Sequence, residues 1–128
     1  MMGEYEDFIE DYVHVTLDEV QWTEIIRRAM SADEKDVHLF ILRSWANSQL
    51  VTAASINAFR GTVMEGHDDR DKANLAISTI TRWIRSISPV KSATCYFWNA
   101  VSGEWTISSA QMKSLRKAFG ASSYPTLS

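Results

Sequence analysis

The sequence predicts a mainly α-helical protein, a bundle of four to six helices with one C-terminal β-hairpin. Apolar residues recur at helical spacing up to residue 87, and strand-like alternation replaces that spacing around residues 94–107. With 128 residues, 45% of them hydrophobic, the chain has enough apolar material for one domain and too little length for two. We therefore expect a single domain over residues 1–128.

Helix-start signals organise the first part of the chain. In a capping box, Ser or Thr and a Glu three residues later satisfy each other's free backbone amides. Two such signals, Thr16–Glu19 and Ser31–Glu34, follow each other closely. They predict a helix over 17–30, a tight corner and a largely buried helix over 34–47. An acidic amphipathic helix is expected before them, over 1–15.

Two further helices complete the expected bundle. The fourth is predicted over 51–64, with Gly61 as a weak point inside it. A polar break over 66–71 precedes the fifth helix, predicted over 72–87. That helix should end before Pro89, because proline disfavours the helical conformation at the residue before it.

The C-terminal part follows the expected bundle, which spans 17–87. Two alternating apolar stretches separated by a polar, glycine-containing turn predict a β-hairpin over 93–108. A short basic helix is predicted over 109–120, with Gly120 as its stop. Residues 121–128 are expected to form a tail.

Charge is distributed unevenly around a net value of −3. Residues 1–20 hold seven acids and no Lys or Arg, whereas from Arg82 onward six bases accompany one acid. This asymmetry suggests head-to-tail self-association or an anionic partner, with ordinary solvated surface charge as the alternative. The charged residues expected at protein interfaces are Glu6, Asp7, Glu10, Asp11, Lys113, Arg116 and Lys117.

Signatures of catalysis and of cofactor binding are mostly absent from the sequence. No glycine begins a phosphate-binding loop, and no serine lies in a nucleophile elbow. The histidines are too widely spaced for paired metal ligation, and the single cysteine, Cys95, is expected to be a packed thiol. No apolar run is long enough to cross a membrane. We expect a non-enzymatic intracellular protein of a reducing compartment, with no cofactor, metal or membrane partner.

The predicted fifth helix carries the best candidate for a binding site. Ser78, Arg82 and Arg85 share a face without acids, and forked arginine donors beside hydroxyls suit phosphate contact. Asn57 and Arg60 of the fourth helix are expected to support them. We predict that these residues bind nucleic acid, single-stranded RNA rather than DNA, although an ordinary solvated face is the alternative.

Two other functions stay open. Small, apolar and hydroxyl residues across the predicted third and fourth helices fit a helix-turn-helix, with the hairpin and basic helix as the wing of a DNA-binding regulator. Leu50, however, stands where that motif usually has glycine. The third possibility is a protein–protein adaptor in which Tyr96, Trp98 and Trp105 of the hairpin form the docking face.

Short segments also occur in a characteristic order: Leu50–Ala53 with Ala58–Phe59, then Asp68–Asp69 with Ala76–Ile77, then Ser102–Thr106 after Phe97. In this order they resemble the coat proteins of rod-shaped plant viruses of the tobamovirus type. The resemblance implies an antiparallel four-helix bundle that assembles side by side around single-stranded RNA. In that family basic residues near the inner loop bind phosphates, and carboxylates that repel across subunits control disassembly.

The resemblance carries over to few individual residues. Arg60 stands near the family's phosphate-binding run but is displaced from it, and Ser78 or Thr79 replaces its partner arginine. The family's outer-rim stretch between the second and third helices is missing here. The residues that would correspond to the repelling carboxylates are Glu65, Asp68, Asp69 and Asp71. The leading hypothesis is a self-assembling, coat- or nucleocapsid-like homo-oligomer that binds nucleic acid.

Overall fold

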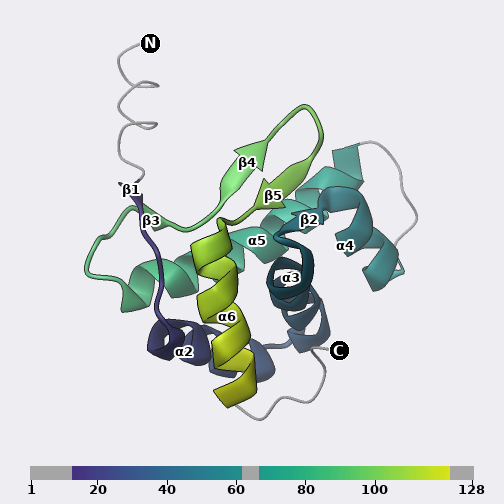
Figure 1. Cartoon of the computed structure of the whole chain (residues 1–128). Helices are drawn as coiled ribbons and strands as arrows, with labels where there is room; N and C mark the ends of the chain where they lie inside the picture. Colours follow the sequence, from purple (N-terminus) through teal and green to yellow (C-terminus); the bar gives the residue numbers. More distant parts are fainter. Residues whose placement is uncertain (1–12, 62–66, 122–128) are drawn as a thin grey trace.

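The computed structural model describes residues 13–61 and 67–121 (Figure 1). It confirms the predicted fold class, because helices dominate the described residues and the strands are short. The helices are α2 (Glu19–Met30), α3 (Lys35–Ser48), α4 (Ala53–Arg60), α5 (His67–Ile87) and α6 (Ser109–Ala121). None of these helices has the length and apolar character needed to cross a membrane.

Helix α3 is the centre of the bundle, as its nearly all-round apolar pattern predicts. It contacts α2, α4, α5 and α6, and α5 runs behind it in Figure 1. Its buried residues are Val37, His38, Leu39, Ile41, Leu42, Trp45 and Ala46. The helix ends at Gln49, which adopts a left-handed conformation with φ of 68° and leads directly into a strand.

Five short strands form two sheets among the described residues. Strand β1 (Val13–His14) pairs in parallel with β3 (Ala93–Thr94). Strands β2 (Leu50–Thr52), β5 (Glu104–Thr106) and β4 (Phe97–Asn99) form an antiparallel sheet in the order β2-β5-β4. The predicted hairpin is therefore present as β4–β5. Its pairing with β2 was not predicted, because three residues between two helices carry too little alternation to indicate a strand.

The expected N-terminal helix is wrong at its end, because Val13–His14 forms β1 and residues 15–18 are extended or irregular. The rest of that prediction, with the four acids named there, lies outside the described residues. The start of α2 also differs from expectation. Its N-cap is Asp18, whose side chain accepts from the backbone N–H of Gln21, and Gln21 completes the capping box. Thr16 lies two residues before this N-cap and takes no part in the capping box.

The other helix boundaries shift for local reasons. The N-cap of α3 is Glu34, which makes no side-chain capping bond, so the predicted box at that corner does not form. Helix α4 begins after Thr52, which shares a capping box with Ser55. It ends at Gly61 instead of continuing through it, because a left-handed φ of 78° suits glycine.

Helices α5 and α6 are both longer than predicted. The expected polar break over 66–71 is wrong from residue 67 onward, since α5 starts at His67. Helix α6 continues past Gly120 to Ala121, so that glycine is not a stop.

A buried glutamine connects α6 to two distant segments. The Oε1 atom of Gln111 accepts from the backbone N–H of Leu17 at 3.0 Å. Its Nε2 atom donates to the carbonyls of Val15 at 2.6 Å and Cys95 at 3.2 Å. Because Gln111 is only 2% exposed, these bonds replace water at the junction between the N-terminal segment, the β3–β4 connection and α6.

Candidate interaction surface

The three-stranded sheet has an apolar row on each face. The central register, Val51–Trp105–Trp98, faces the core, with Val51 and Trp105 buried. Neighbouring positions along a strand point to opposite faces. Leu50 and Phe97, both paired with Thr106 in the adjacent register, therefore lie on the outer face, where Phe97 is 55% exposed.

The hairpin is held firmly on the bundle. The indole N–H of Trp45 donates to the carbonyl of Trp105 at 3.0 Å, which joins α3 to the central strand β5. Gln49 and Ile107 exchange two hydrogen bonds, from Ile107 N to Gln49 O at 2.8 Å and from Gln49 Nε2 to Ile107 O at 3.0 Å. The sheet is thus a fixed part of the fold rather than a free loop.

Strand β4 is an edge of this sheet, and the hairpin that carries it projects at the top of Figure 1. Its three residues include no charged side chain and no proline. In the turn that follows, Asn99 Oδ1 accepts from Val101 N and Ser102 N, and the left-handed φ of 69° falls on Gly103. Val101 at the tip is 98% exposed.

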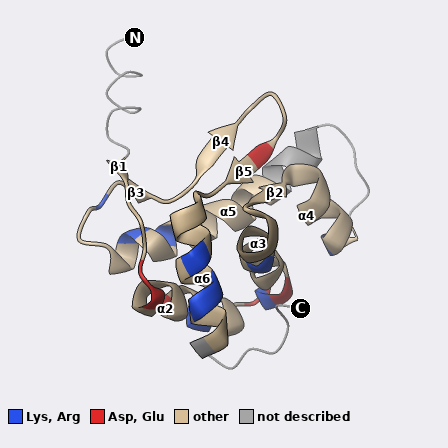
Figure 2. Ribbon diagram, in the orientation of Figure 1, with Lys and Arg blue, Asp and Glu red and all other residues tan. Residues whose placement is uncertain are grey.

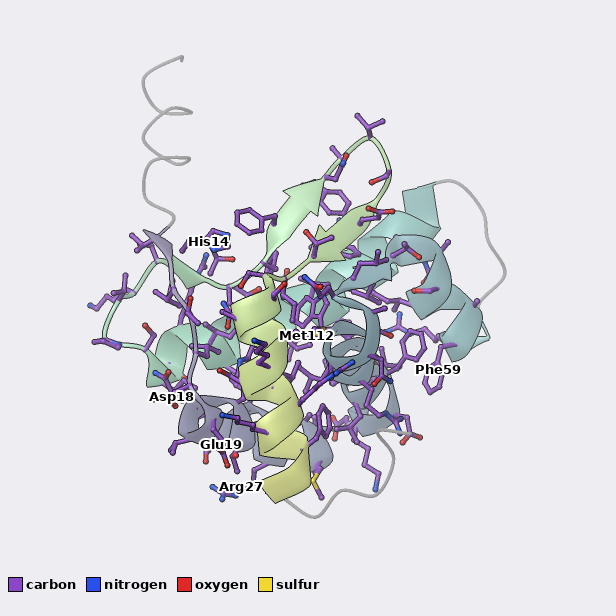
Figure 3. The ribbon with its side chains drawn as sticks, in the orientation of Figure 1. His14, Asp18, Glu19, Arg27, Phe59 and Met112 are labelled. Carbon is purple, nitrogen blue, oxygen red and sulfur yellow. The ribbon has the colours of Figure 1, made fainter. Side chains whose placement is uncertain are left out.

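The base of β4 is covered by the N-terminal strand. The imidazole of His14 stacks on the ring of Phe97 with 3.9 Å between ring centroids. Its Nε2 atom is 2.9 Å from the carbonyl of Tyr96, within hydrogen-bonding distance. In Figure 3 His14 lies beside the start of the hairpin. This contact orders Phe97 without burying it.

The predicted aromatic docking face is only partly accessible. Trp105 is 3% exposed and belongs to the core, packed against Trp98 with ring centroids 4.5 Å apart. Tyr96 packs on Trp45 and shares a hydrogen bond with Thr81, and burial raises the pKa of its phenol. The docking role of Tyr96 and Trp105 is therefore corrected to a structural one. The sequence analysis did not include Phe97 in the docking face. Strand alternation places its side chain on the face of the sheet opposite to that of Trp98.

The predicted phosphate-binding stripe is largely occupied by contacts within the protein. Arg60 Nη2 lies 2.6 Å from Glu34 Oε1, an ion pair between α4 and the start of α3. Arg85 Nε donates to the carbonyl of Ala93 at 3.1 Å, so it caps part of the protein's own backbone. Asn57 is fully buried and is corrected to a core residue, because a side chain without exposed surface has no route to a phosphate.

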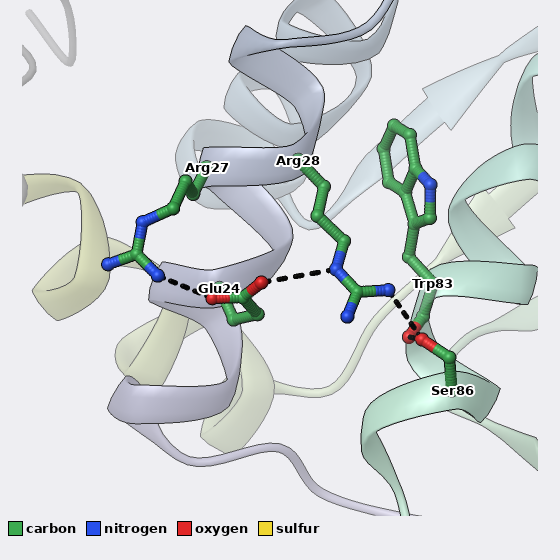
Figure 4. Close-up of polar contacts among 5 residues, drawn as sticks. All are labelled: Glu24, Arg27, Arg28, Trp83 and Ser86. Carbon is green, nitrogen blue, oxygen red and sulfur yellow. Dashed lines mark hydrogen bonds and ion pairs between the residues drawn. The ribbon is translucent and has the colours of Figure 1, made fainter.

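Two members of the stripe stay on the surface. Arg82 and Ser78 are exposed on α5, and Arg82 makes a long contact, 3.4 Å from Nη2 to Thr79 Oγ1. Elsewhere between the helices, Figure 4 shows how Arg28 of α2 bonds to Glu24 and to Ser86 of α5. Arg28 is therefore also engaged by contacts within the protein.

The remaining charged candidates form two groups, a basic one on the C-terminal helix α6 and an acidic one in the first turns of α5. Lys113, Arg116 and Lys117 are exposed on α6, where Figure 2 shows basic segments on its visible side. Arg116 Nε also donates to the carbonyl of Ala46 at 2.6 Å. The predicted carboxylates Asp68, Asp69 and Asp71 fall in the first turns of α5, whereas Glu65 lies outside the described residues.

Two possible reactive groups are buried. Cys95 is fully buried, as expected of a packed thiol, and burial raises its pKa well above the usual range. His38 is 5% exposed and contacts Trp83 edge-on. Burial lowers the pKa of His38 and outweighs the opposite effect of the Glu34 carboxylate. In the part of the chain that the structure describes, no cluster of His, Cys, Asp and Glu is suited to a metal ion.

No protein family, no characterised protein and no solved structure matches this sequence.

Proposed function

We propose that this chain is a non-enzymatic protein-interaction domain that self-associates through strand β4. The observation that carries the proposal is an edge strand on which Phe97 is 55% and Trp98 is 40% exposed. Soluble proteins usually protect exposed edges with lysine, proline or a very short strand, because free backbone groups there pair with other chains. Strand β4 is short, but it has neither charge nor proline, and it presents two large aromatic side chains.

A second copy of the chain is the partner that suits this edge. Two antiparallel β4 strands can pair about a two-fold axis, which makes the same surface meet itself in both copies. The two three-stranded sheets would then form one six-stranded sheet, with Trp98, the middle residue of β4, nearest the axis. Phe97 of each copy would add apolar area on the outer face, and exposed aromatic residues are typical of interface centres.

Replacing Phe97 with lysine tests this proposal. We expect Phe97→Lys to weaken self-association by at least about tenfold, because it places a charge in the apolar outer face of the contact. Sedimentation equilibrium over a concentration series measures the effect. The matched control is Val20→Lys on α2, because Val20 is 77% exposed and the main contacts of α2 are with α3, α5 and α6 rather than with the sheet. A wild-type protein that stays monomeric at every concentration would contradict the proposal, as would equal effects of the two variants.

Nucleic-acid binding is a second candidate, supported by the order of the elements. Helices α4 and α5 are consecutive and in contact, and the β4–β5 hairpin follows them. In order along the chain, these elements are compatible with a helix-turn-helix followed by a wing, one helix later than the sequence suggested, although residues 62–66 between α4 and α5 lie outside the described part. Arg82 and Ser78 are exposed on α5, the helix that would face the nucleic acid. The coat-like hypothesis uses the same arginine on single-stranded RNA.

A salt titration tests the nucleic-acid candidate. If Arg82 contacts a phosphate, Arg82→Gln should reduce the slope of log affinity against log salt by about 0.7 for single-stranded RNA or about 0.9 for duplex DNA. Arg27→Gln is the control, since Arg27 is an exposed arginine already paired with Glu24. Fluorescence anisotropy with both nucleic acids gives the slopes. An unchanged slope, or no binding at low salt, would remove this candidate.

A further inference from the structure

A hollow of about 310 Å³ lies where the start of α3, the end of α4 and the middle of α5 meet. Its size is within the range of small-molecule sites. An adjoining hollow of about 640 Å³ shares part of the same wall. The residues of the first hollow that matter for its chemistry are Asp33, Glu34, His38, Arg60, Leu75 and Thr79.

The wall of the hollow carries a positive and two negative side chains, and some of their donor and acceptor atoms are not used by contacts within the described residues. The side chain of Arg60 is only 20% exposed, and its Nη2 atom is used by Glu34. Among the described residues, its Nε and Nη1 atoms have no hydrogen-bond partner. On the same wall, Asp33 makes no ion pair within the described part, and the Glu34 side chain is 57% exposed. A guanidinium fork and two carboxylates therefore border the same space.

His38 gives an independent indication of a polar ligand. It lines the hollow and is 95% buried, yet neither ring nitrogen has a hydrogen-bond partner in the described structure. An unsatisfied buried polar group is costly, and native proteins retain few of them. A neutral imidazole offers one donor and one acceptor without adding charge. Leu75, which is 67% exposed, adds an apolar surface to this wall.

We propose that this hollow binds a small zwitterion of the α-amino acid type. The ligand carboxylate accepts from Arg60 and from the ring N–H of His38. The ligand ammonium donates to Asp33 and Glu34, and its apolar side chain lies against Leu75. A simple anion is disfavoured because it would face two carboxylates, and a simple amine is disfavoured because it would face the guanidinium.

The test is a titration of the ¹⁵N-labelled full chain with three probes of nearly equal shape. L-Leucine carries both charges, 4-methylpentanoate only the negative one and isopentylamine only the positive one. We expect saturable shifts of backbone amides within residues 32–38 and 75–79 with leucine, and binding at least about tenfold weaker with either single-charge probe. Absence of saturable leucine shifts would overturn the proposal. Equal affinity for 4-methylpentanoate would also overturn it, because the site would then be one for simple anions.

Matched variants assign the two charged partners. Arg60→Met should abolish leucine binding, whereas Arg27→Met, at an exposed arginine of α2 outside the hollow, should leave it unchanged. Glu34→Gln should weaken leucine binding by about tenfold or more while keeping the shape of the wall. Because Glu34 is exposed at the helix start, this variant keeps the test valid if Arg60→Met proves unstable. Unchanged leucine affinity in a folded Arg60→Met or Glu34→Gln variant would overturn the proposal.

Discussion

Replacing Gln111 with alanine is expected to destabilise the protein by about 3 kcal/mol, because it removes three hydrogen bonds and leaves buried backbone groups without partners. The affected groups are the N–H of Leu17 and the carbonyls of Val15 and Cys95, which come from segments that no strand ladder joins to α6. Urea denaturation followed by circular dichroism measures the change in the free energy of unfolding.

Two further variants make the Gln111 result specific. Lys113→Ala, an exposed position on the same helix, should change the free energy of unfolding by less than about 0.5 kcal/mol. Gln111→Glu retains the size of the side chain but replaces the Nε2 donor with an acceptor that would face two carbonyls. Near neutral pH, Gln111→Glu should therefore lower the free energy of unfolding as much as Gln111→Ala does. A loss below about 1 kcal/mol for both Gln111 variants would show that the amide does not hold this junction.

Two buried tryptophans are expected to respond differently to the same substitution. Trp45 and Trp22 are both 0% exposed. The indole N–H of Trp45 donates to the Trp105 carbonyl, whereas the indole N–H of Trp22 has no hydrogen-bond partner among the described residues. Phenylalanine creates a similar cavity at both sites. Trp45→Phe should cost about 3 kcal/mol, but Trp22→Phe only about 1 to 2 kcal/mol, because the latter also removes an unsatisfied donor.

Amide hydrogen exchange gives a second measurement for the two tryptophan variants, because it shows which part of the structure each substitution loosens. Trp45 connects α3 to β5, so Trp45→Phe should speed amide hydrogen exchange in the β4–β5 hairpin more than in α2. Trp22→Phe lies in α2 and should not show this preference for the hairpin. Equal losses of stability in the two variants, with no selective exchange in the hairpin, would contradict the assigned role of the Trp45 bond. Because β4 is the proposed contact strand, this bond also positions the proposed interface.

The candidate surfaces were harder to predict from the sequence than the helices. The face containing Ser78, Arg82 and Arg85 was read from helical spacing, and spacing does not reveal which side chains find partners. Arg85 reaches the carbonyl of Ala93, and Arg60 reaches Glu34 across 26 residues. Guanidinium groups are long and carry five donors, so they often bond to whatever acceptor the tertiary structure brings near. Of the three predicted phosphate-binding arginines, only Arg82 keeps the exposed position that the sequence suggested.

Local sequence determined the mainly helical class, the approximate position of helices α2 to α6 and the β4–β5 hairpin, because helical periodicity and tight turns depend on neighbouring residues. Tertiary structure alone decided the pairing of β2 with β5, the burial of Asn57 and Trp105, and the hollow around Arg60 and His38. Each of these depends on which surfaces meet after the chain folds. The physical reason is that contacts between residues distant in sequence reflect complementary shape and available hydrogen-bond partners, and neither leaves a local period.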